Sequence, residues 1–478
     1  MLTAMCINTF AQTPVWTYTY GNGQYAYGKG IIEDADGSFF VLANEGSSSN
    51  TKINIIKIDS LGEILWKKVI GSEAVYQSED FKRTPDKGLI ITGYTDKNFT
   101  SSYDVLVIKT DSNANVEWEK TYGGSDWDMA HAVLALPDTT YVVAGETYSY
   151  GSGSSDIYIL KLDAVGDTLW TMVYGGDSSD YATCLDTTSD GNYYVGANTK
   201  SFGAGGFDGL IMKMNPFGDT VWTAVYGDSL EDLIYSVKTL PDSGYIFGGS
   251  TQDTGINKQK WAMRFHSNGS FMWSIPQSWT ICPQEEVICS ITVDDSARYV
   301  FVGTTTCYGY GRKEACYSLM GDYAAFYCSY TLGSVWDDGL AYAIQTHDSG
   351  YIAIGSTEGM GPGLSNILIA KTDKDCTIVG TAVHIAGTTE ISDESTKIFS
   401  ILANISTGLF QVMINSTHAL ENADITVYDI LGNIVYSKQI PSAGSQLELN
   451  LTNCTDGMYL VRLTDSSISF AEKIFICR

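Results

Sequence analysis

The sequence predicts an all-β protein: a seven-bladed β-propeller followed by a small β-sandwich. Three observations support this prediction: a tryptophan phrase that recurs at a fixed period, turn residues at fixed places within each period, and a composition rich in glycine and tyrosine. The 478 residues include 48 Gly and 31 Tyr, and only 17% of them are charged. This composition is typical of short strands joined by tight turns.

The repeat is marked by a column of aromatic anchors. Phrases such as TLWTMVYGG and TVWTAVYGD return with successive tryptophans 50 to 52 residues apart. The anchors are Trp16, Trp66, Trp118, Trp170, Trp222 and Trp273, with Cys328 in the seventh slot. A Gly-x-Thr column, for example Gly145 and Thr147, and a Lys-x-Asp column, for example Lys109 and Asp111, follow the same register. Seven anchors in one register predict seven units.

Each unit contains the pattern of four short strands, as in AHAVLAL, YVVAGET, DIYILKLD and TLWTMVYG of the third unit. Pro-Asp or Asp-Gly steps, such as Pro137 and Asp138, separate the first two strands because they supply the dihedral angles of tight turns. One four-stranded sheet cannot bury both of its faces alone, and radial stacking of such sheets supplies the missing cover. We therefore expect a seven-bladed propeller over residues 13–380.

Trp16 predicts how the ring closes. It belongs to the column of outermost strands, yet no inner strands precede it, and the last unit ends after NILIAKTD without an outer strand of its own. We expect the N-terminal strand to complete the last blade, which would remove two exposed sheet edges. The three repeat columns are interpreted as structural, because every blade needs them equally.

The segments outside the repeat have different compositions. Residues 1–12, MLTAMCINTFAQ, are apolar or small and end in Ala-Gln, which predicts the back half of a secretory signal peptide. Residues 381–398 are rich in Thr, Ser and acids, and we expect a linker there. Alternating apolar residues return over 399–478 and predict six or seven strands of a small β-sandwich.

Short motifs stand out in the last 80 residues or so. They are Tyr428, Asp429 and Gly432 in Tyr-Asp-x-x-Gly, Gly457, Tyr459 and Val461 in Gly-x-Tyr-x-Val, and Lys473 before an apolar finish. This region resembles the C-terminal sorting domain of the type IX secretion system, although its usual Pro-Asn-Pro opening is reduced here to Asn404, with Gly408 following. The resemblance implies recognition by the secretion machinery and delivery to the exterior of a Gram-negative outer membrane. The alternative is an ordinary sandwich module that packs on the propeller or mediates adhesion.

Charge and composition exclude several classes of function. With 55 acidic against 28 basic residues the net charge is −27, which would repel a nucleic acid. No apolar run approaches the roughly 18 residues that a membrane-spanning helix needs. The five histidines lie in no metal-protease, nucleophile-elbow or phosphate-loop motif, so we expect no catalytic residues, no metal and no cofactor. We expect a monomer.

Five of the ten cysteines crowd together at 282, 289, 307, 316 and 328. Their spacing lacks the paired C-x-x-C pattern of a zinc site. A local disulfide, with Cys307 and Cys316 as the favoured pair, and plain buried thiols both remain open.

One face of the predicted disc is the candidate binding surface, because the loops between blades and the loops between second and third strands emerge there together. The candidate residues are Trp127, Asp128, Tyr148, Tyr150, Asp180, Phe202, Asp232, Tyr308, Tyr310, Trp336 and Asp338. Aromatic rings beside carboxylates suit sugars, whose C–H faces stack on rings while their hydroxyls donate hydrogen bonds to the acids. We interpret them as an acidic ring with exposed aromatics that binds a glycan or a surface protein. The other interpretation is structural: the aspartates cap turns and the aromatics pack between blades.

These observations favour an exported, non-catalytic binding protein, secreted or displayed on the cell surface. One alternative is a carbohydrate-active or other hydrolytic enzyme that uses paired carboxylates such as Asp337 and Asp338. The near-identity of the units argues against it, since only the sixth unit, with TCYGYGRKEAC, is clearly deviant. A purely structural surface or matrix protein is the third possibility.

Overall fold

The computed structural model divides the chain into two compact units, residues 1–388 and 389–478. The described residues of the first unit are 15–21, 24–47, 49–72, 74–96, 102–252, 257–275, 285–306, 312–321, 326–334, 336–360, 364–375 and 383–386. Those of the second unit are 399–402, 405–406, 409–414, 423–428, 434–440, 446–455, 457–464 and 469–476. The signal peptide expected over residues 1–12 lies outside these ranges.

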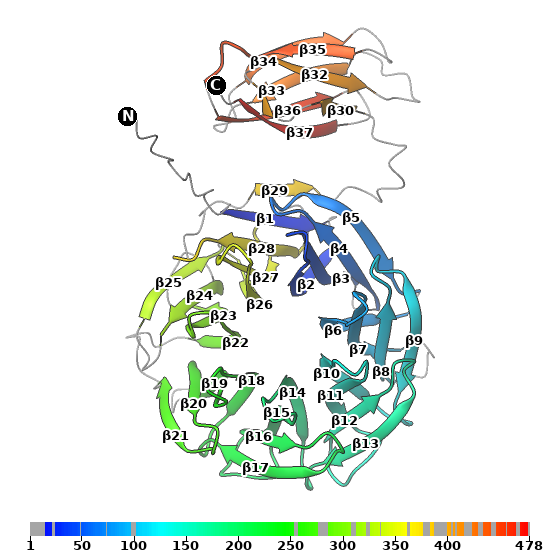
Figure 1. The fold of residues 1–478 in the computed structure, drawn as a ribbon, viewed down its shortest axis with the longest axis vertical. Coiled ribbons are helices and arrows are strands. Elements are labelled where there is room, and N and C mark those ends of the chain that lie inside the picture. The colour runs from blue at the N-terminus through cyan, green and yellow to red at the C-terminus, as the bar shows by residue number, and fades with distance from the viewer. Residues whose placement is uncertain are drawn as a thin grey trace, which may run out of the picture. The chain divides into compact units, whose positions relative to one another are not determined.

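Seven sheets are arranged around a ring in the first unit, which confirms the predicted seven-bladed propeller (Figure 1). Blade 1 contains β2 (Tyr25–Glu33), β3 (Phe39–Ser47), β4 (Asn50–Ile58) and β5 (Ile64–Ile70). Blade 2 contains β6 (Tyr76–Arg83), β7 (Leu89–Thr95), β8 (Asp104–Thr110) and β9 (Val116–Tyr122). Blade 3 contains β10 (Asp128–Ala135), β11 (Tyr141–Thr147), β12 (Asp156–Leu162) and β13 (Thr168–Tyr174).

The next three blades repeat this antiparallel order from the innermost to the outermost strand. Blade 4 contains β14 (Asp180–Thr187), β15 (Tyr193–Thr199), β16 (Asp208–Met214) and β17 (Thr220–Tyr226). Blade 5 contains β18 (Asp232–Thr239), β19 (Tyr245–Gln252), β20 (Lys258–Phe265) and β21 (Phe271–Ile275). Blade 6 contains β22 (Glu286–Val293), β23 (Tyr299–Thr305), β24 (Glu314–Met320) and β25 (Phe326–Leu332).

Blade 7 combines both ends of the propeller. It contains β26 (Asp338–Gln345), β27 (Tyr351–Thr357) and β28 (Asn366–Thr372), followed by β1 (Trp16–Gly21) and β29 (Val383–Ala386). β1 pairs antiparallel with β28, so the N-terminal strand completes the last blade as predicted. β29 pairs parallel with β1 and adds a fifth strand within the segment expected to be a linker.

The tryptophan column joins neighbouring blades, and the lysine column stabilises each blade internally. The indole Nε1 of Trp118 donates to the carbonyl of Ala164 in the next blade at 3.1 Å, and Trp170 donates in the same way to Pro216 at 3.3 Å. The buried Lys109 Nζ lies 2.7 Å from Asp86 Oδ2 in the first turn of its own blade. The structural interpretation of the tryptophan and lysine columns is therefore confirmed for these blades.

Apolar side chains from adjacent sheets interlock to form the core between blades. Between blades 3 and 4, for example, Ala144 and Ile159 pack with Val195 and Met212, all of them fully buried. The outermost strands are covered on fewer sides, and β13 accordingly alternates exposed and partly buried residues.

The expected disulfide between Cys307 and Cys316 is wrong. Cys316 is a free thiol that is buried within β24, opposite Gly303, and Cys289 is also free. Cys307 lies outside the described residues. The alternative that the sequence left open, a buried free thiol, is confirmed for Cys316.

The second unit contains two sheets. One has the order β30 (Phe399–Leu402), β32 (Leu409–Ile414) and β35 (Gln446–Asn450). The other has the order β31 (Ile405–Ser406), β37 (Ser469–Ile476), β36 (Gly457–Thr464), β33 (Ala423–Tyr428) and β34 (Ile434–Ile440). Phe410, Ile425, Val427 and Val461 are buried in this unit. No helix in the described part of the chain has the length and apolarity needed to cross a membrane.

The sorting motif residues fall mostly on the larger of these sheets. Tyr428 ends β33, Gly457 begins β36, and Lys473 lies in β37. Tyr459 and Val461, also on β36, are buried, and the Tyr459 hydroxyl donates to the carbonyl of Thr455 at 2.8 Å. The remaining motif residues, which lie outside the described ranges, are Asn404, Gly408, Asp429 and Gly432.

Candidate functional site

The predicted aspartate column lies inside the protein. Asp128, Asp180, Asp232 and Asp338 each begin the innermost strand of a blade, and none is more than 3% exposed. They do not form the exposed acidic ring that the sequence suggested. A residue that recurs in the same place in successive blades serves the packing of the blades, and here burial removes the carboxylates from solvent.

Hydrogen bonds explain why these carboxylates are buried. Asp180 Oδ2 accepts from the backbone nitrogen of Gly176 at 2.9 Å and from Ser201 Oγ at 2.6 Å, while the Thr199 hydroxyl donates to Oδ1. Asp180 thus ties the loop between blades to the loop between the second and third strands. This is the capping role of the structural interpretation.

An aromatic row lies at the junction of blades 2 and 3, and we define it as Tyr94, Tyr103, Trp127 and Tyr148. Successive ring centroids are 5.1, 5.7 and 6.0 Å apart, with tilted or edge-to-face geometry. Trp127 is 43% exposed and Tyr148 is 41% exposed. The rings of Trp127 and Tyr148 are therefore exposed to solvent, and those of Tyr103 and Tyr94 pack behind them. Tyr94 was missed by sequence reasoning because it lies within a strand, next to Gly93 of the Gly-x-Thr column.

Other predicted aromatics do not join this row. The Tyr150 ring packs 5.8 Å from Tyr158, its hydroxyl donates to the carbonyl of Gly123 at 2.7 Å, and Phe202 packs 5.8 Å from Tyr174. These two side chains cover blade junctions, in agreement with the packing role.

Trp336 is an exposed aromatic outside the row. Its ring lies 5.8 Å from the Arg312 guanidinium. The neighbouring Asp338 Oδ2 accepts from the backbone nitrogen of Ser334 at 2.5 Å, so this carboxylate has a capping role as well. Tyr308 and Tyr310 lie outside the described residues.

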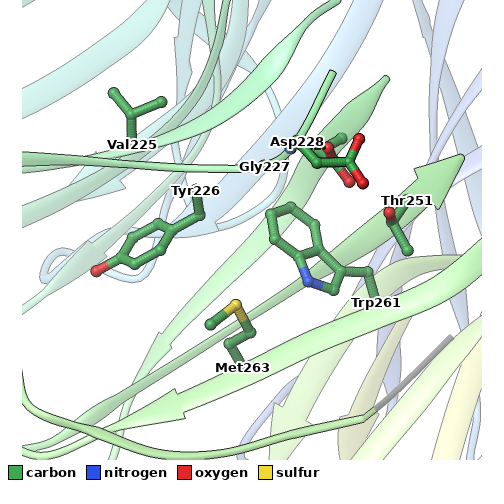
Figure 2. Close-up of a pocket in the computed structure, with 8 residues that line it drawn as sticks. Val225, Tyr226, Gly227, Asp228, Thr251, Trp261 and Met263 are labelled. Atoms are coloured by element: carbon green, nitrogen blue, oxygen red, sulfur yellow. Dashed lines mark hydrogen bonds between the residues drawn. The ribbon is translucent and has the colours of Figure 1, made fainter. Parts of the chain in front are cut away.

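A pocket of about 370 Å³ lies between blades 4 and 5 (Figure 2). Its lining residues are Val225 and Tyr226 of β17, Gly227, Asp228, Asp232 of β18, Thr251 of β19, and Trp261 and Met263 of β20. Figure 2 shows the Trp261 indole between Tyr226, Met263 and Thr251, with the Asp228 carboxylate at the edge. Of these residues only Asp232 was predicted. Trp261 gave a signal of its own, because it is a tryptophan outside the anchor column.

The aromatic row and the pocket are the two candidate sites that the structure shows. Among the described residues, no group of three or more His, Cys, Asp or Glu side chains is placed to hold a metal ion. Aromatic surfaces with nearby carboxylates can instead receive sugars or organic cations.

The propeller and its tail define an exported β-propeller protein. Residues 403–477 match the family described as the secretion system C-terminal sorting domain. This match confirms the type IX sorting domain that the motifs of β36 and β37 suggested. The tail indicates a protein that is secreted or held at the cell surface.

Other similarities are more distant. The chain is 26% identical over 198 residues to the regulatory protein FlaEY of Caulobacter vibrioides, which covers 35% of this chain and 20% of that protein. The chain thus matches about a fifth of the length of this curated relative.

Two solved structures illustrate the structural likeness. The WD40 domain of Neurospora crassa Pan2 has a TM-score of 0.46 and 10% identity, covering 74% of this chain and 91% of that chain. The β-propeller domain of the Trilobed protease from Pyrococcus furiosus has a TM-score of 0.43 and 8% identity, covering 73% of this chain and 94% of that chain.

Proposed function

We propose that this protein is an exported, non-catalytic binding protein that recognises glycans through the aromatic row. The observation that supports the proposal is the pair of exposed rings, Trp127 and Tyr148, whose centroids lie 6.0 Å apart at 67° on the blade 2–3 junction. Tyr94 and Tyr103 contact each other and extend the row behind the exposed rings. The exposed side chains are therefore held in place before binding, which lowers the entropy cost of binding a ligand. Rigid aromatic surfaces of this kind suit the C–H faces of sugar rings.

Carboxylates beside the row supply hydrogen-bond acceptors for sugar hydroxyls. Asp126 is exposed and precedes Trp127 directly. Glu146 lies in β11, two residues before Tyr148; burial raises the pKa of the Tyr148 hydroxyl, and the charge of Glu146 raises it further. His131 Nε2 lies 3.5 Å from Glu146 Oε1 and orients it. The acids next to the aromatic row are thus Asp126 and Glu146 rather than the buried aspartate column.

The test is binding of the purified full chain to insoluble cellulose, xylan and chitin and to a glycan array. The Trp127→Ala, Tyr148→Ala double variant should bind at least about tenfold more weakly, because an aromatic anchor at the centre of a contact commonly accounts for more than 1.4 kcal/mol. Phe217→Ala is the matched control, since Phe217 is 80% exposed and lies away from the row in the turn before β17. Unchanged binding by the double variant, or no glycan bound by the wild type, would reject the proposal.

We also infer that the sorting domain directs the chain through the type IX system to the exterior of a Gram-negative outer membrane. The match over residues 403–477 supports this route. Fractionation of cells that express the full chain should place the propeller outside the outer membrane and without its tail. A chain lacking residues 399–478 should accumulate in the periplasm, and its appearance outside the cell would contradict the route.

A further inference from the structure

The pocket between blades 4 and 5 lies where the repeat departs from its own pattern. At the two preceding junctions, Gly124 and Gly176 follow the outer strand, and a Cβ on them would lie 3.2 Å from the Tyr150 ring and 3.6 Å from the Phe202 ring. Asp228 takes the place of this glycine at the blade 4–5 junction and lies on the wall of the pocket. At this junction an exposed carboxylate therefore stands where the two preceding junctions have glycine.

A second departure makes room for Trp261. The third strands of blades 2 and 3 have Val105 and Ile157 where blade 4 has Gly209. A Cβ on Gly209 would lie 3.1 Å from Cζ3 of the Trp261 indole. Phe247 contacts the indole edge-to-face, with ring centroids 5.0 Å apart. The indole is therefore fixed in place and only 8% exposed, as the floor of the pocket.

The carboxylates of Asp208 and Asp232 lie close together behind the pocket, and no lysine or arginine among the described residues pairs with them. Asp208 Oδ1 and Asp232 Oδ2 both approach the position of a Cβ on Gly227, and the Asp232 oxygen lies 2.9 Å from it. Asp208 is 1% exposed, and its Oδ1 has no hydrogen-bond partner. Within the described ranges, neither of these carboxylates nor that of Asp228 forms an ion pair with a lysine or arginine. A buried carboxylate oxygen without a partner is unfavourable, so a positive charge nearby would stabilise it.

The pKa values of these carboxyls agree with this geometry. Burial, and then the charge of Asp232, raises the pKa of Asp208. Burial also raises the pKa of Asp232, with a further contribution from the charge of Asp228. Burial is the larger cause of both pKa shifts, and the charge of the neighbouring acid adds to each of them.

We propose that this pocket binds an organic cation, an alkylammonium group that rests on the Trp261 indole and turns its charge toward the exposed Asp228 carboxylate, with the buried carboxylates of Asp208 and Asp232 behind it. Indole is the best aromatic partner for a cation, and the Asp228 carboxylate on the rim adds a charge-assisted attraction. The volume of about 370 Å³ suits a small organic molecule. The described residues place no set of ligating side chains for a metal ion, which favours a bulky, weakly hydrated cation over a metal. The site is separate from the aromatic row.

The probe that tests this proposal is choline, with its neutral isostere 3,3-dimethylbutan-1-ol as the matched ligand. Calorimetric titration of the full chain at constant ionic strength should detect choline binding, and the isostere should bind at least tenfold more weakly. Equal affinity for the two ligands, or no binding of choline, overturns the proposal.

Two variants locate the binding. Trp261→Leu introduces the residue found at this position in blades 2 and 4, Leu106 and Leu210, so the sheet keeps an apolar side chain there. Asp228→Gly introduces the glycine of the two preceding junctions and removes an exposed side chain, whose Oδ1 accepts from the Leu230 nitrogen at 2.8 Å. Each should weaken choline binding at least tenfold, and unchanged affinity in both variants contradicts the site. Trp127→Ala should leave choline binding intact, so this result is independent of glycan recognition.

Discussion

Trp16, the first residue of β1, pairs with Lys371 of β28, and its indole Nε1 also donates to the carbonyl of Ser60 in blade 1 at 3.1 Å. The same strand makes a second such contact, because the Tyr20 hydroxyl donates to the carbonyl of Gly62 at 2.6 Å. One strand of six residues therefore completes blade 7 and holds blade 1. Since each blade of a repeat contacts only its neighbours, this strand is one of the links that close the ring.

Trp16→Ala should lower the free energy of unfolding by about 3 to 5 kcal/mol, the range for truncating a large buried aromatic side chain. Trp16→Phe should have a smaller effect, because it removes the indole hydrogen bond and keeps a ring. Urea unfolding followed by circular dichroism measures both. Leu169→Ala, at a residue that is 54% exposed on β13, is the control and should stay within about 0.5 kcal/mol. A Trp16→Ala effect no larger than that of the control would show that closure does not limit stability.

The first turn of every blade contains an aspartate with a lowered pKa. These residues are Asp34, Asp86, Asp138, Asp190, Asp242, Asp294 and Asp348. For Asp86, burial alone would raise the pKa, but hydrogen bonds from Lys109 and Thr84 lower it to about 2. A carboxyl whose pKa is lower in the folded state stabilises that state at pH values above its unfolded pKa. This stabilisation disappears as the pH falls through the folded value.

We therefore expect the free energy of unfolding to fall between about pH 4 and pH 2. Lysine side chains stay charged throughout this range. Urea unfolding at pH 6, 4 and 2.5 measures the change. Lys109→Met removes one of the paired cations and should make this pH dependence shallower, whereas Lys374→Met, at an exposed residue, should leave it unchanged. Constant stability from pH 6 to pH 2.5 would contradict the role of the turn aspartates.

The parts of the fold that the sequence predicted are those that every blade needs. Anchors such as Trp118 and paired residues such as Lys109 recur because each blade meets its neighbour in the same way. The β-bulge in every innermost strand was not predictable. Its bulged residue is a different amino acid in each blade, so it depends on backbone geometry rather than on side-chain type. These residues are Lys29, Glu79, His131, Thr183, Tyr235, Cys289 and Ala341.

The candidate site was predictable only in part. Trp127 was expected to be exposed because it lies in a loop between blades, and the structure agrees. Asp128 was expected beside it in solvent, but spacing along the chain does not determine burial, and its carboxylate turns inward to the Gly124 nitrogen at 2.7 Å. Trp261 stands out in the sequence as a tryptophan outside the anchor column, but the sequence does not show what surrounds it. Only its contact with Gly209, a residue of another blade, reveals the room around it.

Cys289 and Cys316 of blade 6 should be unreactive in the folded protein. Burial, with a further contribution from Cys316, raises the pKa of the Cys289 thiol to about 12, and burial also raises the pKa of Cys316. At pH 8 the reactive thiolate is therefore a very small fraction of either residue. Iodoacetamide treatment followed by peptide mass spectrometry should show little labelling of both in buffer and complete labelling in guanidinium chloride. Equal labelling rates under the two conditions would contradict the low reactivity expected of the buried Cys316 and the partly buried Cys289.

The capping role of the aspartate column predicts a loss of stability when a cap is removed. Asp180→Ala leaves the Gly176 nitrogen and the hydroxyls of Thr199 and Ser201 without their acceptor. Buried donors without a partner cost about 1 to 3 kcal/mol each, so unfolding free energy should drop by at least about 2 kcal/mol. Asp177→Ala, at an exposed aspartate of the same loop, is the matched control and should change stability by less than about 0.5 kcal/mol.

Hydrogen exchange separates the capping role from a ligand-binding role. In Asp180→Ala the amides of residues 200–207 should exchange faster than in the wild type, because the loop loses the side chain that ties it to the neighbouring blade junction. If Asp180 served a ligand instead, its removal would weaken binding and leave exchange and stability unchanged. The burial of Asp180 at 0% exposure favours the first outcome, since a ligand in solvent has no path to a carboxylate enclosed by its own loop.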